Sequence, residues 1–213
     1  MSILNLIASS QGRRDDAPNK ALAKTLASQR DEAGIQELVD HLDNPDQAVQ
    51  SDCMKVLYEV GYLAPDLIAP FWQIFMQHLG SKNNRLVWGS MIALDTIACI
   101  KADELFAARG VIEKAVESGS VITQDAGMRA LSRIAGKRED YRENLLPFLL
   151  QFLEKCPSKD LPRQAESVLP AIDSQHAGLF LQVLCNRQSD LTDRQAARLQ
   201  KVINKTEALE PGE

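Results

Sequence analysis

The chain has 213 residues, with 24 Lys and Arg against 29 Asp and Glu, so its formal net charge is -5 at pH 7. Hydrophobic residues make up 45% of it, which is enough for a packed core and excludes a wholly disordered chain. The acidic balance argues against a dedicated nucleic-acid binder, because such proteins neutralise phosphates with a surplus of Lys and Arg.

The N-terminal region contains a short apolar run that Asn5 interrupts and that no basic residue precedes, so we expect no signal peptide. No stretch approaches the ~20 apolar residues of a membrane span. The cysteines are widely spaced, with no C-x-x-C pair and no neighbouring histidine to suggest a zinc site. We interpret them as reduced, mostly buried thiols of a cytoplasmic protein. They are Cys53, Cys99, Cys156 and Cys185.

Residues 1–30 are predicted to form an N-terminal segment and a capping helix over about 18–29, with Asp16 as its N-cap. The apolar side chains at the start of the chain would cover the first repeat or dock onto a partner, including a second copy in a homo-oligomer. These side chains are Ile3, Leu4, Leu6 and Ile7.

The main feature of the sequence is an internal repeat of 37 or 38 residues, anchored on four leucines. Around each anchor, position i-4 is small and positions i-1 and i+3 are apolar, which places one apolar face on one helix. The small residue suits a helix whose backbone approaches a neighbour closely. The anchors are Leu57, Leu94, Leu131 and Leu169, and the small residues are Cys53, Ser90, Gly127 and Ala165.

A second apolar series has the same period and belongs to a preceding helix in each repeat. Turn signals such as Asn44-Pro45-Asp46 separate the two helices, and no strand-like alternation appears. The class is therefore all-α. The second series is Leu38, Phe75, Ile112 and Leu149, followed by Leu42, Leu79, Val116 and Leu153.

Each helix pair has an apolar face that it cannot bury alone, so stacking the pairs creates one continuous core. The prediction is an α-solenoid, or superhelix, of about five antiparallel helix pairs in a repeat domain over 31–206, with a flexible tail at 207–213. The pairs are expected at about 31–62, 65–101, 103–137, 139–173 and 175–206.

These pairs resemble HEAT repeats, the two-helix units of armadillo-type solenoids. The resemblance rests on the segment 49–61 (Val-Gln-Ser-Asp-Cys-Met-Lys-Val-Leu-Tyr-Glu-Val-Gly) and on Pro70 and Pro147, which look like the proline of the first HEAT helix. It covers roughly 31–206 and identifies no subfamily, because Asp and Arg do not recur at matching positions. It implies a solenoid that binds other macromolecules, and it supplies no catalytic residues.

The sequence contains no nucleophile elbow, phosphate loop, dinucleotide fingerprint or zinc-protease motif, so we expect a non-enzymatic protein without a cofactor. Carboxylate pairs such as Asp15/Asp16 and Asp103/Glu104 fall at expected helix starts, where capping explains them. His41 and His78 are 37 apart and share one position of the repeat, but the third repeat has Ala115 there. We therefore expect solvated histidines at helix ends and no metal site.

A helical wheel of the second helices predicts a partner-binding surface opposite the core face. In solenoids of this type the second helices line the concave side, and this side would be apolar at one end and basic at the other. Such a groove would accept a peptide or partner helix, with an acidic residue near the arginines. The predicted residues are Tyr58, Tyr62, Trp88, Ile92, Asp95, Arg129 and Arg133.

Two other interpretations stay open at this point. Trp88 and Tyr58 would be structural if they pack between repeats, and full burial of both would remove them from a partner surface. HEAT-like solenoids such as the alkylpurine DNA glycosylases bind or repair nucleic acid in a basic cleft with a catalytic carboxylate. The candidates here are Arg129, Arg133 and Arg163 with Asp95 or Asp125. A likeness to phycobilisome lyases is weaker, because no residue set would handle a bilin thioether.

Overall fold

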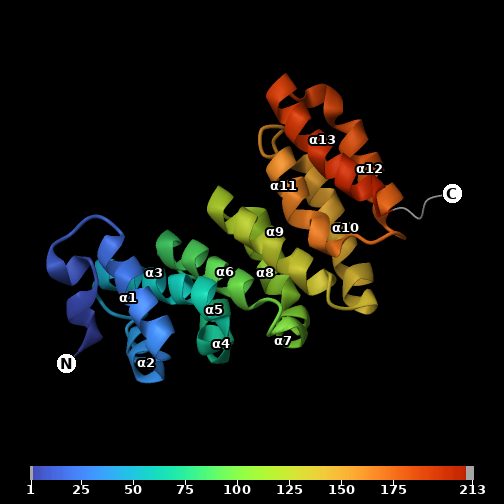
Figure 1. Ribbon diagram of the computed structural model, residues 1–213. Helices are drawn as coiled ribbons and strands as arrows, with labels where there is room; N and C mark the ends of the chain where they lie inside the picture. The colour runs from blue at the N-terminus through green and yellow to red at the C-terminus, as the bar shows by residue number, and fades with distance from the viewer. Residues whose placement is uncertain (1, 210–213) are drawn as a thin grey trace. The chain divides into compact units, whose positions relative to one another are not determined.

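The computed structural model describes residues 2–209, and these form α-helices and short 3-10 turns without a strand (Figure 1). The fold class is the predicted all-α solenoid of stacked helix pairs. The chain divides into two compact parts, Met1–Gly127 and Met128–Glu213, with α9 passing from the first into the second.

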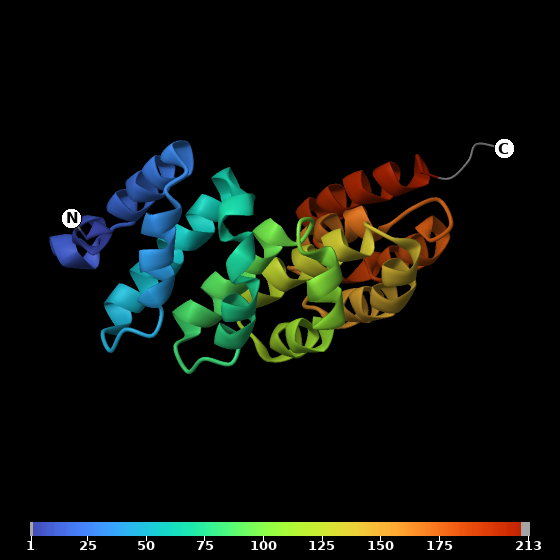
Figure 2. The ribbon, with the colours of Figure 1, turned by 90° about the horizontal axis from the view of Figure 1, so that it is seen from below.

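The first part stacks its helix pairs in chain order, as the blue to green ribbon of Figure 2 shows. α1, α3 and α6 pack side by side, while α2 packs on α3 and α5 packs on α6. The elements are η1 (Ile3–Leu6), η2 (Ser9–Gln11), α1 (Ala17–Gln29), α2 (Glu32–Asp40), α3 (Gln47–Leu63), α4 (Pro65–Ile68), η3 (Ala69–Phe71), α5 (Trp72–His78), α6 (Asn84–Ile97), α7 (Ala102–Ala107), α8 (Arg109–Ser118) and α9 (Val121–Ala135).

The second part repeats this arrangement: α10 packs against α11 and α12, and α13 packs against α11 and α12. Its elements after α9 are α10 (Glu139–Lys155), α11 (Leu161–Val168), η4 (Leu169–Ala171), α12 (Ala177–Asn186), η5 (Gln188–Asp190) and α13 (Asp193–Glu207). The predicted tail begins at Glu207, which is the last residue of α13, and its residues 210–213 lie outside the described ones. No helix among residues 2–209 combines the length and the apolar character needed to cross a membrane.

The repeated apolar positions form the core. Leu57, Leu94 and Leu131 are all 0% exposed, and every member of the second series is buried. Leu169 is the exception, because it is only partly buried. Pro170 has no N–H to donate within the helix, so α11 ends at Val168 and a 3-10 turn carries the fourth anchor.

The small residues of the repeat allow the predicted close approach of helices. A Cβ atom at Gly127 would lie 2.3 Å from Cγ2 of Val116 on the preceding helix. Gly61 is equally tight, because a Cβ there would lie 2.3 Å from Oγ1 of Thr96, which brings the C-terminal turns of α3 and α6 together. Larger side chains at either position would force the helices apart.

The N-terminal segment covers the first repeat. Ile7 is fully buried, and the backbone N–H groups of Ala8 and Ser9 donate to Asn19 at 2.9 Å and to Asp52 at 2.6 Å. Asn19 in turn donates to Asp52 at 2.7 Å. One carboxylate of α3 therefore fixes both the segment and α1, while Leu6 remains 47% exposed.

The capping of α1 differs in detail from the prediction. Asp16 occupies the N-cap position, but its side chain makes no capping bond. The neighbouring Asp15 accepts the N–H of Ala17 at 2.9 Å instead, which leaves Asp16 to pair with Lys55 at 3.3 Å.

The two prolines of the first helices act differently. α10 runs through Pro147, whereas the expected first helix around Pro70 is divided into α4, η3 and α5. Only one helical turn precedes Pro70, so little of the hydrogen-bond ladder is available to hold the helix across the missing donor.

The cysteines are unpaired thiols, but only Cys53 and Cys156 are buried. The expectation of mostly buried thiols is wrong for Cys99 and Cys185, which are exposed, the first just beyond the end of α6 and the second in the last turn of α12. Burial raises the pKa of the Cys53 thiol to about 12, so this group stays protonated and unreactive.

The prediction of solvated histidines is wrong for His78. This residue is only 6% exposed, because the C-terminal turn of α5 is packed in the core. Burial lowers its pKa below the usual 6.5, although Asp43, 4.0 Å from Nε2, opposes this shift. His41 is partly exposed, and its Nδ1 lies 2.8 Å from the carbonyl oxygen of Glu37.

This burial predicts a pH dependence of stability. Above pH 6.5 His78 is neutral whether the chain is folded or unfolded, but below this value the unfolded chain takes up a proton that the folded one resists. We expect the free energy of unfolding to fall between about pH 7.5 and about pH 5.5, and His78→Gln to remove part of that fall. Urea unfolding at both pH values measures it, and an unchanged slope in the variant would contradict the assignment.

Candidate functional site

Three aromatic side chains form a row across two adjacent second helices. Tyr58 of α3 lies at the centre, with its ring centroid 6.3 Å from that of Tyr62, one turn further along α3. On its other side, the ring centroid of Trp88 on α6 is 5.9 Å away. Edge-to-face and tilted contacts at these distances stabilise the row.

The expected exposure of this surface is only partly correct. Tyr62 is 56% exposed and Trp88 is partly buried, but Tyr58 is 6%, Ile92 8% and Asp95 1% exposed. A helical wheel describes each helix alone, but α3 and α6 pack side by side, and this packing covers the flanks that face each other. Tyr58, Ile92 and Asp95 are therefore packing residues of the first part, and Tyr62 and Trp88 are the ones that present surface.

Lys55 contacts the central ring of the aromatic row and is held there by two carboxylates. Its Nζ lies 2.7 Å from Oε1 of Glu59, 3.3 Å from Oδ2 of Asp16 and 4.7 Å from the ring centroid of Tyr58. Burial by itself would lower the pKa of Lys55, but the bonds to Glu59 and the contact with Tyr58 raise it overall. Lys55 is therefore a fixed cation that holds the Tyr58 ring.

A hollow of about 260 Å³ opens beside this row. Arg14 and Arg85 lie on its wall with exposed side chains, and neither pairs with an acidic side chain among residues 2–209. The sequence pattern predicted neither residue as part of the site. Arg85 could have been predicted, because it precedes Trp88 by one helical turn. Arg14 could not, because it lies in the segment before α1 and belongs to no repeat. The hollow is lined by Arg14, Asp16, Ser51, Asp52, Lys55, Tyr58, Arg85 and Trp88.

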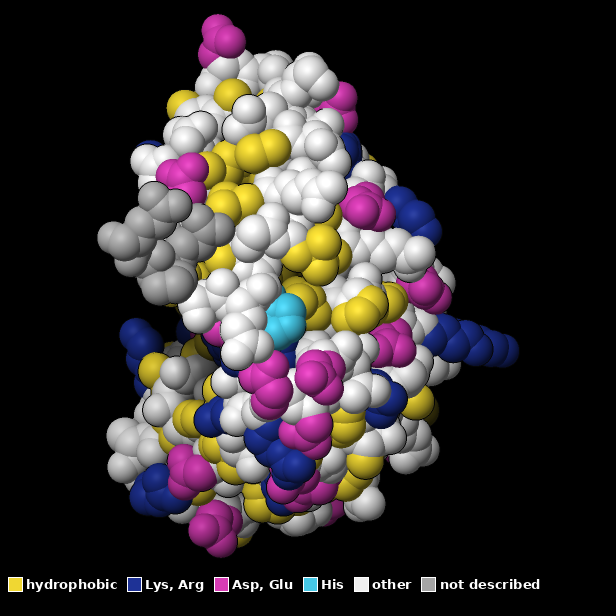
Figure 3. Space-filling view, turned by 90° about the vertical axis from the view of Figure 1, so that its right-hand side faces the viewer, with side chains coloured by type: hydrophobic (Ala, Val, Ile, Leu, Met, Phe, Trp, Pro, Cys, Tyr) yellow, Lys and Arg dark blue, Asp and Glu magenta, His cyan; other side chains and the backbone are white. Residues whose placement is uncertain are grey.

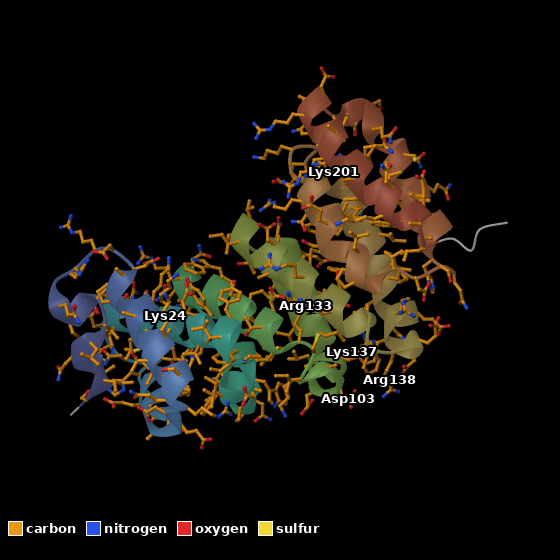
Figure 4. All side chains as sticks on the ribbon, viewed as in Figure 1. Lys24, Asp103, Arg133, Lys137, Arg138 and Lys201 are labelled. Atoms are coloured by element: carbon orange, nitrogen blue, oxygen red, sulfur yellow. The ribbon has the colours of Figure 1, made fainter. Side chains whose placement is uncertain are left out.

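The predicted basic residues lie in the second part. Arg129 and Arg133 are on α9 and partly buried, and Figure 4 labels Arg133 there. Arg163 of α11 pairs with Asp160 at 2.8 Å. The role of Arg129 and Arg133 in holding an acidic residue of a partner stays a prediction.

One cluster in the second part has the residue types of a metal site. Ligand atoms of Glu139, Asp173 and His176 lie within 4.8 Å of one another. Arg142 lies among them, with Nη1 at 2.6 Å from Glu139 and 2.8 Å from Asp173. The guanidinium already neutralises both carboxylates, so this cluster is an ion-pair network that ties α10 to the start of α12.

No family model matches the sequence, and no curated protein is significantly similar to it. Solved structures match it in fold. An engineered protein superposes with a TM-score of 0.66 at 17% identity, covering 99% of this chain and 98% of its own. Computationally designed armadillo repeat proteins for modular peptide recognition reach 0.63 at 13% identity, covering 95% and 97%.

A natural solenoid is also similar. The karyopherin Kap121p bound to the SUMO protease Ulp1p gives a TM-score of 0.64 at 15% identity over 90% of this chain, which spans only 22% of the karyopherin. The chain is thus a HEAT/armadillo-type α-solenoid in fold.

Proposed function

We propose that this solenoid is a non-enzymatic protein-interaction module that binds a peptide or partner helix on the surface formed by α3, α6 and the segment before α1. The observation that carries the proposal is the aromatic surface of Tyr62 and Trp88 at the two ends of the row. At the Trp88 end, Arg14 and Arg85 line the same hollow and form no ion pair within residues 2–209. Aromatic and arginine side chains of this kind dominate binding energies at protein interfaces.

The packing around this pair favours recognition over mere coverage of the core. Tyr58 is buried at the contact between α3 and α6, whereas Tyr62 packs against it edge to face and keeps 56% of its surface exposed. Lys55 and Glu59 fix the row, which reduces the entropy lost when a partner binds. The similarity to armadillo proteins designed for peptide recognition, and to a karyopherin bound to another protein, supports the same class of function.

We expect Tyr62→Ala combined with Trp88→Ala to abolish partner binding, because each side chain would lose a hot-spot contact of about 2 kcal/mol or more. Capture from native cell extract with wild-type and variant protein measures this. Trp72→Ala, on the first helix α5, is the matched control for the loss of an indole ring.

The control should retain the partner, and circular dichroism should show equal helicity in all three proteins. Loss of the same partner by Trp72→Ala, or its retention by the double variant, would overturn the assignment of the surface. Capture of nucleic acid by wild-type protein in place of a protein would favour the nucleic-acid alternative.

A further inference from the structure

A second groove lies in the part Met128–Glu213, between the first helices α10 and α12, which pack against each other. It has a volume of about 310 Å³. One stripe of α10 forms one wall and the start of α12 forms the other. Figure 3 faces this side and shows hydrophobic side chains gathered beside a histidine, with acidic side chains around them. The lining is Glu143, Leu146, Pro147, Leu150, His176 and Leu179.

The apolar part of the groove has a buried floor and an exposed wall. Leu146 and Leu150 are 3% and 6% exposed, so they form a floor that packing holds in place. Leu179 is 51% exposed and Pro147 is also exposed. A fixed apolar floor between exposed apolar walls fits one inserted aliphatic side chain.

The polar end of the groove offers acceptors. Glu143 is exposed, and its carboxylate has no hydrogen bond or ion pair within residues 2–209. Pro147 has no N–H, so it cannot donate the usual helical bond to the carbonyl of Glu143, four residues earlier. Arg142, the residue before Glu143, is already bound to Glu139 and Asp173. A cationic group from outside is therefore the complement to this end.

The distance between Glu143 and Leu150 indicates how many residues separate the charged and the apolar side chain of such a ligand. Glu143 and Leu150 are seven residues apart on α10, which is about 10 Å along the helix. An extended chain covers this distance with about three residues.

We propose that the groove between α10 and α12 binds an extended segment of a partner protein in which a Lys or Arg lies two or three positions from an aliphatic residue. The cation pairs with Glu143, and the aliphatic side chain packs on Leu150, between that residue and Leu179. This site shares no residue with the surface that contains Tyr62 and Trp88, and it does not depend on the function proposed for that surface.

A displayed library of random peptides, selected on the intact protein, tests the proposal. Enriched peptides should share the basic and aliphatic pair, and fluorescence anisotropy then gives their Kd for each variant. We expect Leu179→Ala to raise Kd roughly tenfold and Glu143→Gln to raise it roughly two- to fivefold, the latter less at high salt.

Glu154→Gln makes the same charge change on an exposed residue at the far end of α10, and it should leave Kd unchanged. Binding should also survive Tyr62→Ala with Trp88→Ala, which separates this site from the proposed function. The proposal is wrong if no enriched peptide depends on Leu179, if the enriched peptides are acidic, or if Glu154→Gln weakens binding as much as Glu143→Gln does.

Discussion

A Leu94→Ala variant is expected to lose about 2–5 kcal/mol of its free energy of unfolding. Leu94 is 0% exposed on α6, the helix that packs against α3, α4 and α5. Truncation would leave a cavity among these elements, because a protein interior is close-packed and relaxes only partly around a missing side chain.

Urea unfolding followed by circular dichroism measures the loss. Ile100→Ala is the control, because Ile100 lies three residues beyond the end of α6 and is 47% exposed. Its effect should stay within about 0.5 kcal/mol. Equal losses in the two variants would show that Leu94 has no special place in the core.

Arg187→Ala should destabilise the second part by roughly 2–4 kcal/mol, since charged hydrogen bonds contribute more than neutral ones and three backbone acceptors lose their donor. Arg187 follows α12, and its Nη1 donates to the carbonyls of Leu153 and Glu154, both at 2.8 Å, while Nη2 donates to that of Cys156 at 3.1 Å. These carbonyls end α10, where the helix dipole also favours a cation.

The planar fork of the guanidinium is needed for this contact, so Arg187→Lys should recover only part of the stability. Arg194→Ala, at an exposed position of α13, is the matched control and should have almost no effect. Thermal unfolding of the wild type and the three variants measures these differences in stability. Full recovery by lysine would mean that charge alone, and not the bidentate geometry, holds the end of α10.

The periodic pattern predicted the fold because burial in a solenoid repeats with the chain. Each repeat contributes the same face to the same neighbour, so Leu57, Leu94 and Leu131 occupy equivalent places in the core. The pattern failed at Leu169, where Pro170 breaks the helical ladder and replaces one turn of α11 with η4. A local backbone effect of this kind shifts a side chain without changing the period.

The candidate site was predictable only in outline. The wheel located the aromatic face, but it could not say which residues the neighbouring helix covers, so Tyr58, Ile92 and Asp95 were expected at a surface that they do not reach. Arg14 could not be associated with Trp88 either, because the two come from different elements, and only packing brings them to one hollow.

The sequence by itself determined the helix pairs, their period and the residues of the core, because these depend on hydrophobic spacing within each helix. Only the tertiary structure decided which flanks of α3 and α6 are covered and which charged side chains lack a partner among the described residues. It also decided that Arg187 binds the carbonyls at the C-terminal end of α10. These features depend on contacts between residues about 30 or more positions apart, and the angle and distance between packed helices set those contacts.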